Sequence, residues 1–197
     1  MNSTRISGDD TSRISITIGI IVALIAVAIA SYFIFVGWAK AKEVTGFDPN
    51  RPVPSDEVLR KRLKPEQFHV TRENGTETPF QNDYWNNVRT GLYVDIITGE
   101  PLFTSAAKWD NSTGQLTFTK PIAYDLLLEK QDLSHDMVRT EVRVRRSNSH
   151  LGHVFGDPKS PTGRRYSVNS AAFRFIPIER LDDQGYEKFH SVFDQQQ

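Results

Sequence analysis

A serine and two histidines in the last third of the chain are the side chains whose types and spacing could do chemistry. Ser167 lies in "GRRYSVNSAAFRFIP", a segment that otherwise has the pattern of a β-strand. His150 and His153 lie three residues apart in "SHLGHVFGD", and Asp157 follows closely. A hydroxyl beside imidazoles could form a nucleophile and base, as in hydrolases. The two imidazoles could also act as acid and base at another reactive centre, or join Asp157 in an open metal site.

The simplest alternative gives these side chains no chemistry. Histidines at the end of a strand commonly form hydrogen bonds to the backbone, and a serine within a sheet needs only a polar partner. The glycine between the two histidines frees the backbone there, so the pair could meet a carboxylate after a turn. Spacing alone therefore leaves all of these interpretations open.

The segments that would have to position these side chains have the patterns of short β-strands. From Phe68 onward, short apolar or alternating runs such as "LYVDII", "VRTEVRV" and "AFRFIPI" are separated by Gly, Pro, Asn and Asp clusters. This pattern predicts one mainly β, antiparallel domain over residues 64–193, followed by a tail at 194–197. The run "RVRR" at 143–146 alternates along such a strand, which predicts a solvent-exposed face for Arg143 and Arg145.

The amino end carries a different kind of segment. Residues 14–38 contain no charged side chain, and as a helix they would be about 37 Å long against a hydrocarbon core of about 30 Å. This predicts one N-terminal transmembrane helix that anchors the chain in the membrane as a single pass, after a tail at 1–13. A cleavable signal peptide ending near Ala41 is the alternative. A short tail before an anchor usually stays inside, so we expect the domain to be extracytoplasmic.

Residues 39–63 are predicted to form a tether and a short helix. The stretch "FDPNRPVPS" is rich in Pro and turn formers, and Ser55 could cap the helix "DEVLRKRL". In that helix Val58, Leu59 and Leu63 are expected to share one buried side.

Composition excludes several classes of function. The 197 residues include 24 basic and 24 acidic side chains, so charge gives no reason to expect a nucleic acid partner. Cysteine is absent, which excludes disulfides, thiolate metal sites and a thiol nucleophile. The oligomeric state stays unknown from sequence.

Beyond these patterns, the chain resembles the B-type methionine-R-sulfoxide reductases, known as the MsrB or SelR family. The similar motifs follow in order, from "LKPEQFHVTRENGTETPFQNDYWNN" through "GLYVDIITGEPLFTSAAKWD" and "DLSHDMVRTEVR" to "SHLGHVFGDPKSPTGRRYSVNSAAFRFIP". The resemblance implies two antiparallel sheets around a shallow site. It also implies reduction of free or protein-bound methionine-R-sulfoxide to the thioether, with a thioredoxin-type reductant.

The resemblance also implies which residues form the site. Ser167 occupies the position of the family's nucleophilic cysteine, and the histidines, asparagine, arginine and acidic residue around it match His150, His153, Asn169, Arg165 and Asp157. Family members hold the substrate methyl group against the tryptophan of "GWPSF". The corresponding segment here is "GQLTF", which makes Gln115 and Phe118 the candidate substrate-binding residues.

A structural zinc is not expected. Many family members bind one through four cysteines, whose positions are occupied here by Asp95, Thr98, Val144 and Ser147. The chain thus resembles the zinc-free branch, with no metal and no cofactor, and core packing is expected to stabilise the domain instead.

Ser167 decides what the resemblance can mean for function. The family reaction oxidises a thiolate to a sulfenic acid, and a serine oxygen has no equivalent oxidation product. We therefore expect a reductase-like pseudoenzyme or binding module, which could bind methionine-R-sulfoxide in a peptide or protein at a membrane surface. The alternatives are an active reductase whose native cysteine has been replaced by Ser167, a Ser/His hydrolase-like activity and a metal site.

Overall fold

The computed structural model describes residues 18, 21–32, 46–109 and 112–194. The chain divides into two units, residues 1–43 and 44–197. In the first unit, residue 18 and residues 21–32 are helical, while the rest of the predicted span at 14–38 and the tail at 1–13 lie outside the described residues. None of the helices formed by the described residues is long and apolar enough to cross a membrane.

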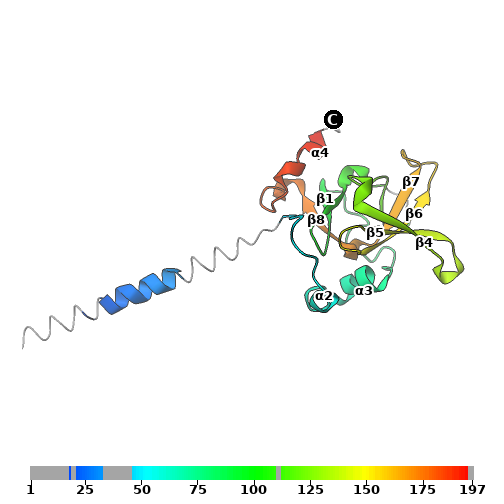
Figure 1. Cartoon of the computed structure of the whole chain (residues 1–197). Helices are drawn as coiled ribbons and strands as arrows, with labels where there is room; N and C mark the ends of the chain where they lie inside the picture. The colour runs from blue at the N-terminus through cyan, green and yellow to red at the C-terminus, as the bar shows by residue number, and fades with distance from the viewer. Residues whose placement is uncertain (1–17, 19–20, 33–45, 110–111, 195–197) are drawn as a thin grey trace, which may run out of the picture. The chain divides into compact units, whose positions relative to one another are not determined.

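The second unit is built on two antiparallel sheets (Figure 1). The first has the order β2-β1-β8, with β1 Gly91–Asp95, β2 Pro101–Thr104 and β8 Phe173–Pro177. The second has the order β3-β7-β6-β5-β4, with β3 Leu116–Phe118, β4 Leu127–Asp132, β5 Arg139–Val144, β6 His150–Gly156 and β7 Arg164–Val168. The expectation of a mainly β domain with two antiparallel sheets is confirmed.

Aromatic side chains from both sheets form the core. Phe103 from the first sheet and Phe118 from the second stack with ring centroids 4.4 Å apart, and Tyr93 contacts Phe118 edge-on at 5.0 Å. All three are fully buried. Because the apolar positions of strands alternate with polar ones, burying one face of the second sheet leaves its other face free to carry a site.

The helices of this unit lie at separate places around the sheets (Figure 1), and one of them departs from the sequence expectation. The α-helices are α2 Asp56–Arg62, α3 Pro65–Glu73 and α4 Ser191–Asp194, and the 3-10 turns are η1 Ser105–Ala107, η2 Tyr124–Leu126, η3 Ser134–Asp136, η4 Ser170–Ala172, η5 Ile178–Arg180 and η6 Glu187–Phe189. Helix α3 was not expected. Its sequence explains it, since Pro65 opens the helix and the Gln67 side chain accepts from the Lys64 N–H at 3.0 Å.

Helix α2, which the sequence analysis placed in the tether, packs on the domain. Leu59 and Leu63 are buried with Phe68 and Ile97. Val58 is 50% exposed, so the expectation that it shares their buried side is wrong. Ser55 stands at the N-cap position, but its side chain makes no capping hydrogen bond.

An arginine fixes the segment that leads into the domain. Arg146, in the turn between β5 and β6, donates to the carbonyl oxygens of Pro49, Asp48 and Arg51, the last at 2.5 Å. Its guanidinium also lies 5.5 Å from the centroid of the Phe47 ring. Residues 47–51 are therefore held against the β5–β6 turn.

The positions where the resemblance places zinc-binding cysteines form a hydrogen-bonded cluster instead. Asp95 is buried and accepts from the Thr98 hydroxyl at 2.7 Å and from the Ser149 hydroxyl at 3.2 Å. The hydroxyls of Ser147 and Ser149 lie 2.8 Å apart, while Val144 is buried in the core. Burial raises the pKa of Asp95, opposed by these hydrogen bonds. We call Asp95, Thr98, Ser147 and Ser149 the Asp95 cluster.

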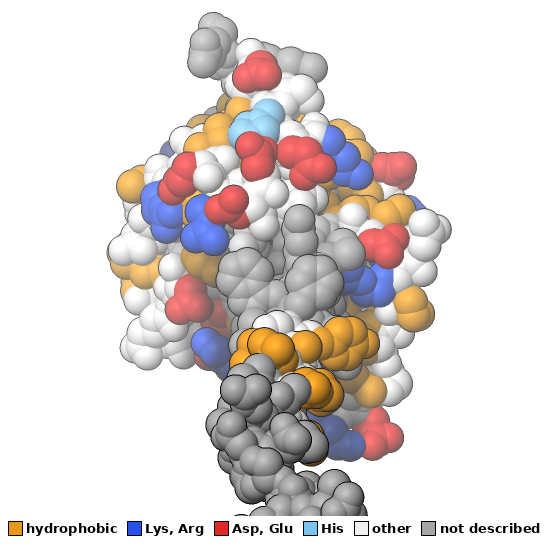
Figure 2. All heavy atoms as spheres, turned by 90° about the vertical axis from the view of Figure 1, so that its left-hand side faces the viewer, with side chains coloured by type: hydrophobic (Ala, Val, Ile, Leu, Met, Phe, Trp, Pro, Cys, Tyr) orange, Lys and Arg blue, Asp and Glu red, His pale blue; other side chains and the backbone are white. Residues whose placement is uncertain are grey.

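The visible surface carries no patch of a single charge. Figure 2 shows acidic and basic side chains interspersed over the face in view. This agrees with the equal numbers of acidic and basic residues in the sequence.

Candidate functional site

Two of the predicted site residues, Ser167 and His153, lie side by side on the second sheet, where strand pairing aligns them in a row with Thr117 and Glu141. Ser167 on β7 pairs with His153 on β6 and with Thr117 on β3, and His153 pairs in turn with Glu141 on β5. Residues directly opposite in antiparallel strands share a face, with Cβ atoms about 4.5–5.5 Å apart. The predicted serine and histidine are therefore neighbours across strands, which sequence spacing alone did not establish.

Both histidines reach the same cavity because β6 is irregular. Residues three apart on a regular strand point to opposite faces. Here the β5–β6 register shifts between Val142 and Arg143, which brings His150 and His153 to ring centroids 5.7 Å apart. Gly152 has φ of 148°, and a Cβ on it would lie 2.2 Å from the Ser167 carbonyl oxygen. Only glycine fits this irregular position.

His153 is held by a carboxylate that the sequence analysis did not select. Its Nε2 lies 2.7 Å from Asp132 Oδ2. Hydrogen bonds from the Ser134 hydroxyl and N–H, and then from His153, lower the pKa of Asp132. An ionised carboxylate only accepts, so His153 Nε2 donates to Asp132. Arg139 binds the same Asp132 oxygen at 2.7 Å and completes a half-buried ion-pair group.

His150 is held in the same way by a second carboxylate. Its Nδ1 lies 2.7 Å from Glu141 Oε1. Burial acts to raise the pKa of Glu141, but hydrogen bonds from His150 and Arg143 outweigh it and the pKa is lowered. Burial also lowers the pKa of His150, against the opposing effect of Glu141. His150 is thus a neutral imidazole that donates its Nδ1 proton to Glu141.

The remaining nitrogen of His150 has no partner. His150 is 2% exposed, and its buried Nε2 makes no hydrogen bond with any described residue. With the proton on Nδ1, Nε2 carries a lone pair and can only accept. His150, His153, Asp132 and Glu141 all line a polar cavity of about 350 Å³. A ligand that enters this cavity and donates to Nε2 would satisfy a group that is costly to leave buried.

Arg143 binds the carboxylate of Glu141, and its burial corrects the expectation that it faces solvent. It is 8% exposed, so the predicted solvent-exposed face is wrong for this residue. Its guanidinium binds Glu141 Oε1 at 2.5 Å and Asn74 Oδ1 at 2.7 Å, and its Nε donates to Asn148 Oδ1 at 3.0 Å. Multiple charge-assisted hydrogen bonds offset the loss of solvation.

The other predicted residues around Ser167 are engaged in separate contacts. Asn169 is buried, accepts from the Glu77 N–H at 3.0 Å and donates to the Leu151 carbonyl oxygen at 3.0 Å. Arg165 pairs with Asp157, with Nε 3.3 Å from Oδ2, and its guanidinium lies 5.0 Å from the Phe155 ring centroid. Asn169 therefore fixes the backbone near the serine, while Asp157 orients an arginine.

The metal interpretation is not supported. Asp157 binds Arg165 instead of converging with the histidines. In the described ranges, no group of three or more His, Cys, Asp or Glu side chains is arranged to hold a metal ion.

Of the two candidate substrate-binding residues, one is accessible and one is not. Gln115 is half-buried at the edge of the sheet, and its amide donates to the Glu77 carbonyl oxygen at 3.3 Å. Phe118 is fully buried against Phe103, so it supports the core beneath the site and presents no surface to a ligand in this structure.

Ser167 itself is partly exposed. The structure gives its hydroxyl no hydrogen bond to either imidazole among the described residues, and Ser167 is not among the residues lining the 350 Å³ cavity. Sequence reasoning missed Asp132 and Glu141. Their signal was present in "DLSHDMVRTEVR", a stretch that places carboxylates on strands neighbouring the histidines.

Comparisons with known proteins identify the family to which the chain belongs. Residues 63–177 match the SelR domain. Over 140 residues the chain is 50% identical to a Vibrio cholerae protein named peptide methionine sulfoxide reductase MsrA/MsrB, covering 71% of this chain and 37% of that relative. The chain thus spans well under half the length of the relative it matches. With more than half of its residues matched to one family and its two-sheet fold in place, the chain belongs to the SelR, or B-type methionine sulfoxide reductase, family.

Proposed function

We propose that this protein is a membrane-anchored SelR domain that binds methionine-R-sulfoxide in peptides or proteins without reducing it. The observation that carries the proposal is Ser167, which occupies the nucleophile position implied by the family motif in a chain without cysteine. Reduction requires a thiolate to attack the sulfoxide sulfur, accept its oxygen as sulfenic acid and thereby supply two electrons. The serine oxygen cannot be oxidised in this way, so the domain has no electron donor.

Ser167 can nevertheless hold the substrate. A sulfoxide oxygen is a hydrogen-bond acceptor, and the serine hydroxyl is a donor. His153 lies beside Ser167 across the strand pair and is held in place by Asp132. The acceptor at His150 Nε2 suits a different group, such as a peptide N–H next to the sulfoxide. The site therefore offers one donor and one acceptor to an oxidised methionine in a polypeptide.

The sequence of residues 14–38 supports the membrane anchor in this proposal. Residues 14–38 are uncharged and long enough, at about 37 Å as a helix, to span a bilayer. With the short N-terminal tail inside, the domain would be extracytoplasmic and would meet proteins at the membrane surface. Extraction with carbonate tests this part, because an anchored chain stays in the membrane pellet and an unanchored one is released.

The decisive experiment uses the full-length chain in mild detergent with dithiothreitol and a peptide that contains methionine-R-sulfoxide. We expect the unmodified protein to reduce the peptide no faster than buffer, and Ser167→Cys to gain measurable turnover because the histidines and Arg165 remain to lower the thiol pKa. Ser167→Ala is the matched control and should stay inactive.

Binding is measured separately by titrating the same peptide into the unmodified protein. We expect saturable binding that prefers the sulfoxide over the thioether and weakens in Ser167→Ala. Turnover by the unmodified protein would contradict the pseudoenzyme proposal, and equal affinity for sulfoxide and thioether would contradict the binding role.

A second candidate, a hydrolase, is favoured by the Asp132–His153 hydrogen bond beside a serine. It requires the Ser167 hydroxyl to come within about 3.2 Å of an imidazole nitrogen. A fluorophosphonate probe tests it directly. Labelling of Ser167 that His153→Ala abolishes would favour the hydrolase, and an unlabelled serine would exclude it.

A further inference from the structure

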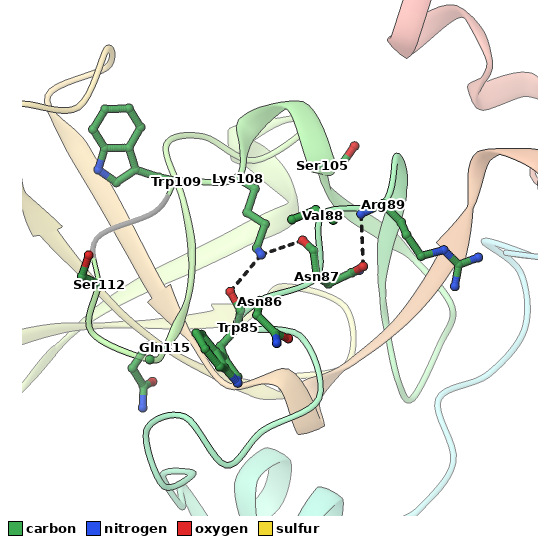
Figure 3. Close-up of a pocket in the computed structure, with 11 residues that line it drawn as sticks. Trp85, Asn86, Asn87, Val88, Arg89, Ser105, Lys108, Trp109, Ser112 and Gln115 are labelled. Carbon is green, nitrogen blue, oxygen red and sulfur yellow. Dashed lines mark hydrogen bonds between the residues drawn. The ribbon is translucent and has the colours of Figure 1, made fainter.

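A second cavity lies beside the candidate site and has a different chemical character. Its volume is about 410 Å³, within the usual range for ligand pockets. It is lined by residues from the segments 85–89, 105–109 and 112–115, and Figure 3 shows Trp85 and Trp109 on two different segments of the chain. Apolar surface comes from these rings and from Val88, which is 95% exposed, and polar groups come from Asn86 and Gln115. This mixture suits an apolar side chain together with the backbone groups that carry it.

The loop that carries Trp85 is fixed by hydrogen bonds before any ligand arrives. The Lys108 ammonium donates to the Trp85 carbonyl oxygen at 2.9 Å and to that of Asn87 at 2.7 Å, as the dashed lines in Figure 3 show. Asn82 Oδ1 accepts from the Trp85 N–H at 3.2 Å, and the Asn87 amide donates to the Tyr93 hydroxyl at 2.9 Å. A preformed loop loses little conformational entropy on binding.

The rim next to Trp85 carries a strained aromatic residue. Phe80 has φ of 64°, which is an outlier for a bulky side chain, and it is 54% exposed. Its N–H donates to the Gly114 carbonyl oxygen at 2.9 Å, and its ring meets Trp85 edge-on at 5.1 Å. Gly114 has to be glycine, because a Cβ there would lie 2.5 Å from the Phe80 ring. Strain of this kind gathers at ligand-binding surfaces, where the surrounding structure maintains it.

Gln115 connects this cavity to Ser167. It lines the cavity, and it precedes by two residues Thr117, which pairs with Ser167. Two strand residues cover about 7 Å, at about 3.3 Å each. An extended peptide covers the same distance in two residues, so a peptide whose sulfoxide side chain meets Ser167 would bring a residue about two positions away to the cavity.

We infer that this cavity is a subsite for an apolar or aromatic side chain located two residues from the methionine sulfoxide of a bound peptide, with Trp85 as its main contact. The inference rests on the proposed function, which it extends from a single oxidised side chain to a peptide sequence. Trp85 supplies an aromatic contact next to Gln115, where the family motif has its own tryptophan.

The test uses the full-length chain labelled with 5-fluorotryptophan, whose three resonances are assigned with Trp85→Phe and Trp109→Phe variants. Three probes are titrated: a pentapeptide with leucine two residues from methionine-R-sulfoxide, the same peptide with norleucine in place of the sulfoxide, and capped methionine-R-sulfoxide alone. We expect both peptides to shift the Trp85 resonance, the first at lower concentration, and the capped amino acid to leave it unmoved.

Substitution supplies a second measurement. Trp85→Ala should weaken binding of the sulfoxide pentapeptide about tenfold, as expected for an aromatic contact at a binding centre, and change binding of the capped amino acid less than about twofold. Trp85→Phe should restore much of the loss. Tyr124→Ala is the control, because it removes an exposed aromatic ring that does not line this cavity.

The outcomes separate this inference from the proposed function. An unmoved Trp85 resonance with both peptides would overturn the subsite even if the capped sulfoxide binds. Equal losses for peptide and capped sulfoxide in Trp85→Ala would also overturn it, because Trp85 would then serve the sulfoxide site. A Trp85 shift with both peptides at equal concentrations, with no binding of the capped sulfoxide, would support an apolar subsite and contradict the proposed function.

Discussion

The Asp95 cluster and the row around Ser167 are both polar groups set into a β domain, but their hydrogen bonding differs. At Asp95 the buried carboxylate accepts from both the Thr98 and Ser149 hydroxyls, so these groups satisfy one another. Next to the row around Ser167, one imidazole nitrogen lacks a partner in the described part of the chain. His150 Nε2 has no partner among the described residues, although its ring is almost completely buried.

The difference separates a structural role from a binding role. A satisfied buried network stabilises one conformation and offers nothing to a ligand. A buried acceptor without a partner costs free energy in the empty protein, and a ligand that donates to it recovers that cost. The hydrogen bonds of the Asp95 cluster therefore contribute to the fold, whereas the buried acceptor of His150 can be satisfied by a ligand.

The largest expected effect concerns the histidine next to Ser167. In the Ser167→Cys background, His153→Ala should lower kcat/KM for a methionine-R-sulfoxide peptide by about 10²- to 10⁴-fold, because it removes a general acid and base. Asp95→Asn in the same background should change kcat/KM by less than about twofold. Steady-state kinetics of the two double variants measure this. A similar decrease of kcat/KM in both would contradict the difference between the Asp95 cluster and the row around Ser167.

The free energy of unfolding should depend more on the Asp95 cluster than on Ser167, the opposite of the effect expected on kcat/KM. Asp95→Ala removes the shared acceptor and leaves buried hydroxyl and amide groups unpaired, which should lower the free energy of unfolding by about 2–4 kcal/mol. Ser167→Ala should change it by less than about 0.5 kcal/mol, since the serine is partly exposed and bonds neither histidine. Urea unfolding of the full-length variants in mild detergent measures both. A large decrease in the free energy of unfolding of Ser167→Ala would contradict this contrast, because the serine would then stabilise the fold.

A smaller effect should appear with pH at the boundary of the site. Glu77 accepts from the N–H groups of Ser170 and Ala171 at 2.5 and 2.7 Å, and burial raises its pKa to about 7. Between the unfolded pKa of 4.5 and about 7 the folded state binds more protons, so its stability should fall as pH rises, by at most about 1.4 kcal/mol per pH unit. Glu77→Gln should flatten this slope. If the stability of the parent and of Glu77→Gln changes with pH at the same slope, other titratable groups cause that slope.

Strand patterns predicted the fold better than the partners of the site. Alternation in "VRTEVRV" and "AFRFIPI" identified strands in both sheets, because a half-buried strand must alternate. Arg143 shows the limit of that rule. Alternation assigns a side chain to a face but does not reveal that Asn74, Glu141 and Asn148 converge on it and make its burial possible.

The histidine partners were hidden for a related reason. Asp132 on β4 reaches His153 across 21 positions of sequence, and Glu141 on β5 reaches His150 across 9 positions. Register decides which residues meet across a sheet, and here a bulge beside Gly152 alters it. The motif order indicated that Ser167 and the histidines share a site, whereas the carboxylates that hold them required the three-dimensional arrangement.

The hydrogen bonds that hold residues 47–51 against Arg146 have a mechanical consequence. A pull applied to the chain upstream of Phe47 would load both the packing of Phe47 on the cluster around Leu92 and Ile176 and the Arg146 hydrogen bonds to residues 48, 49 and 51. Helix α2 follows these contacts in the chain and would take the load once they broke. Because Arg146 lies between β5 and β6, tension on the amino-terminal side of the domain would be transmitted to the sheet that carries Ser167 as well as to the sheet formed by β1 and β8.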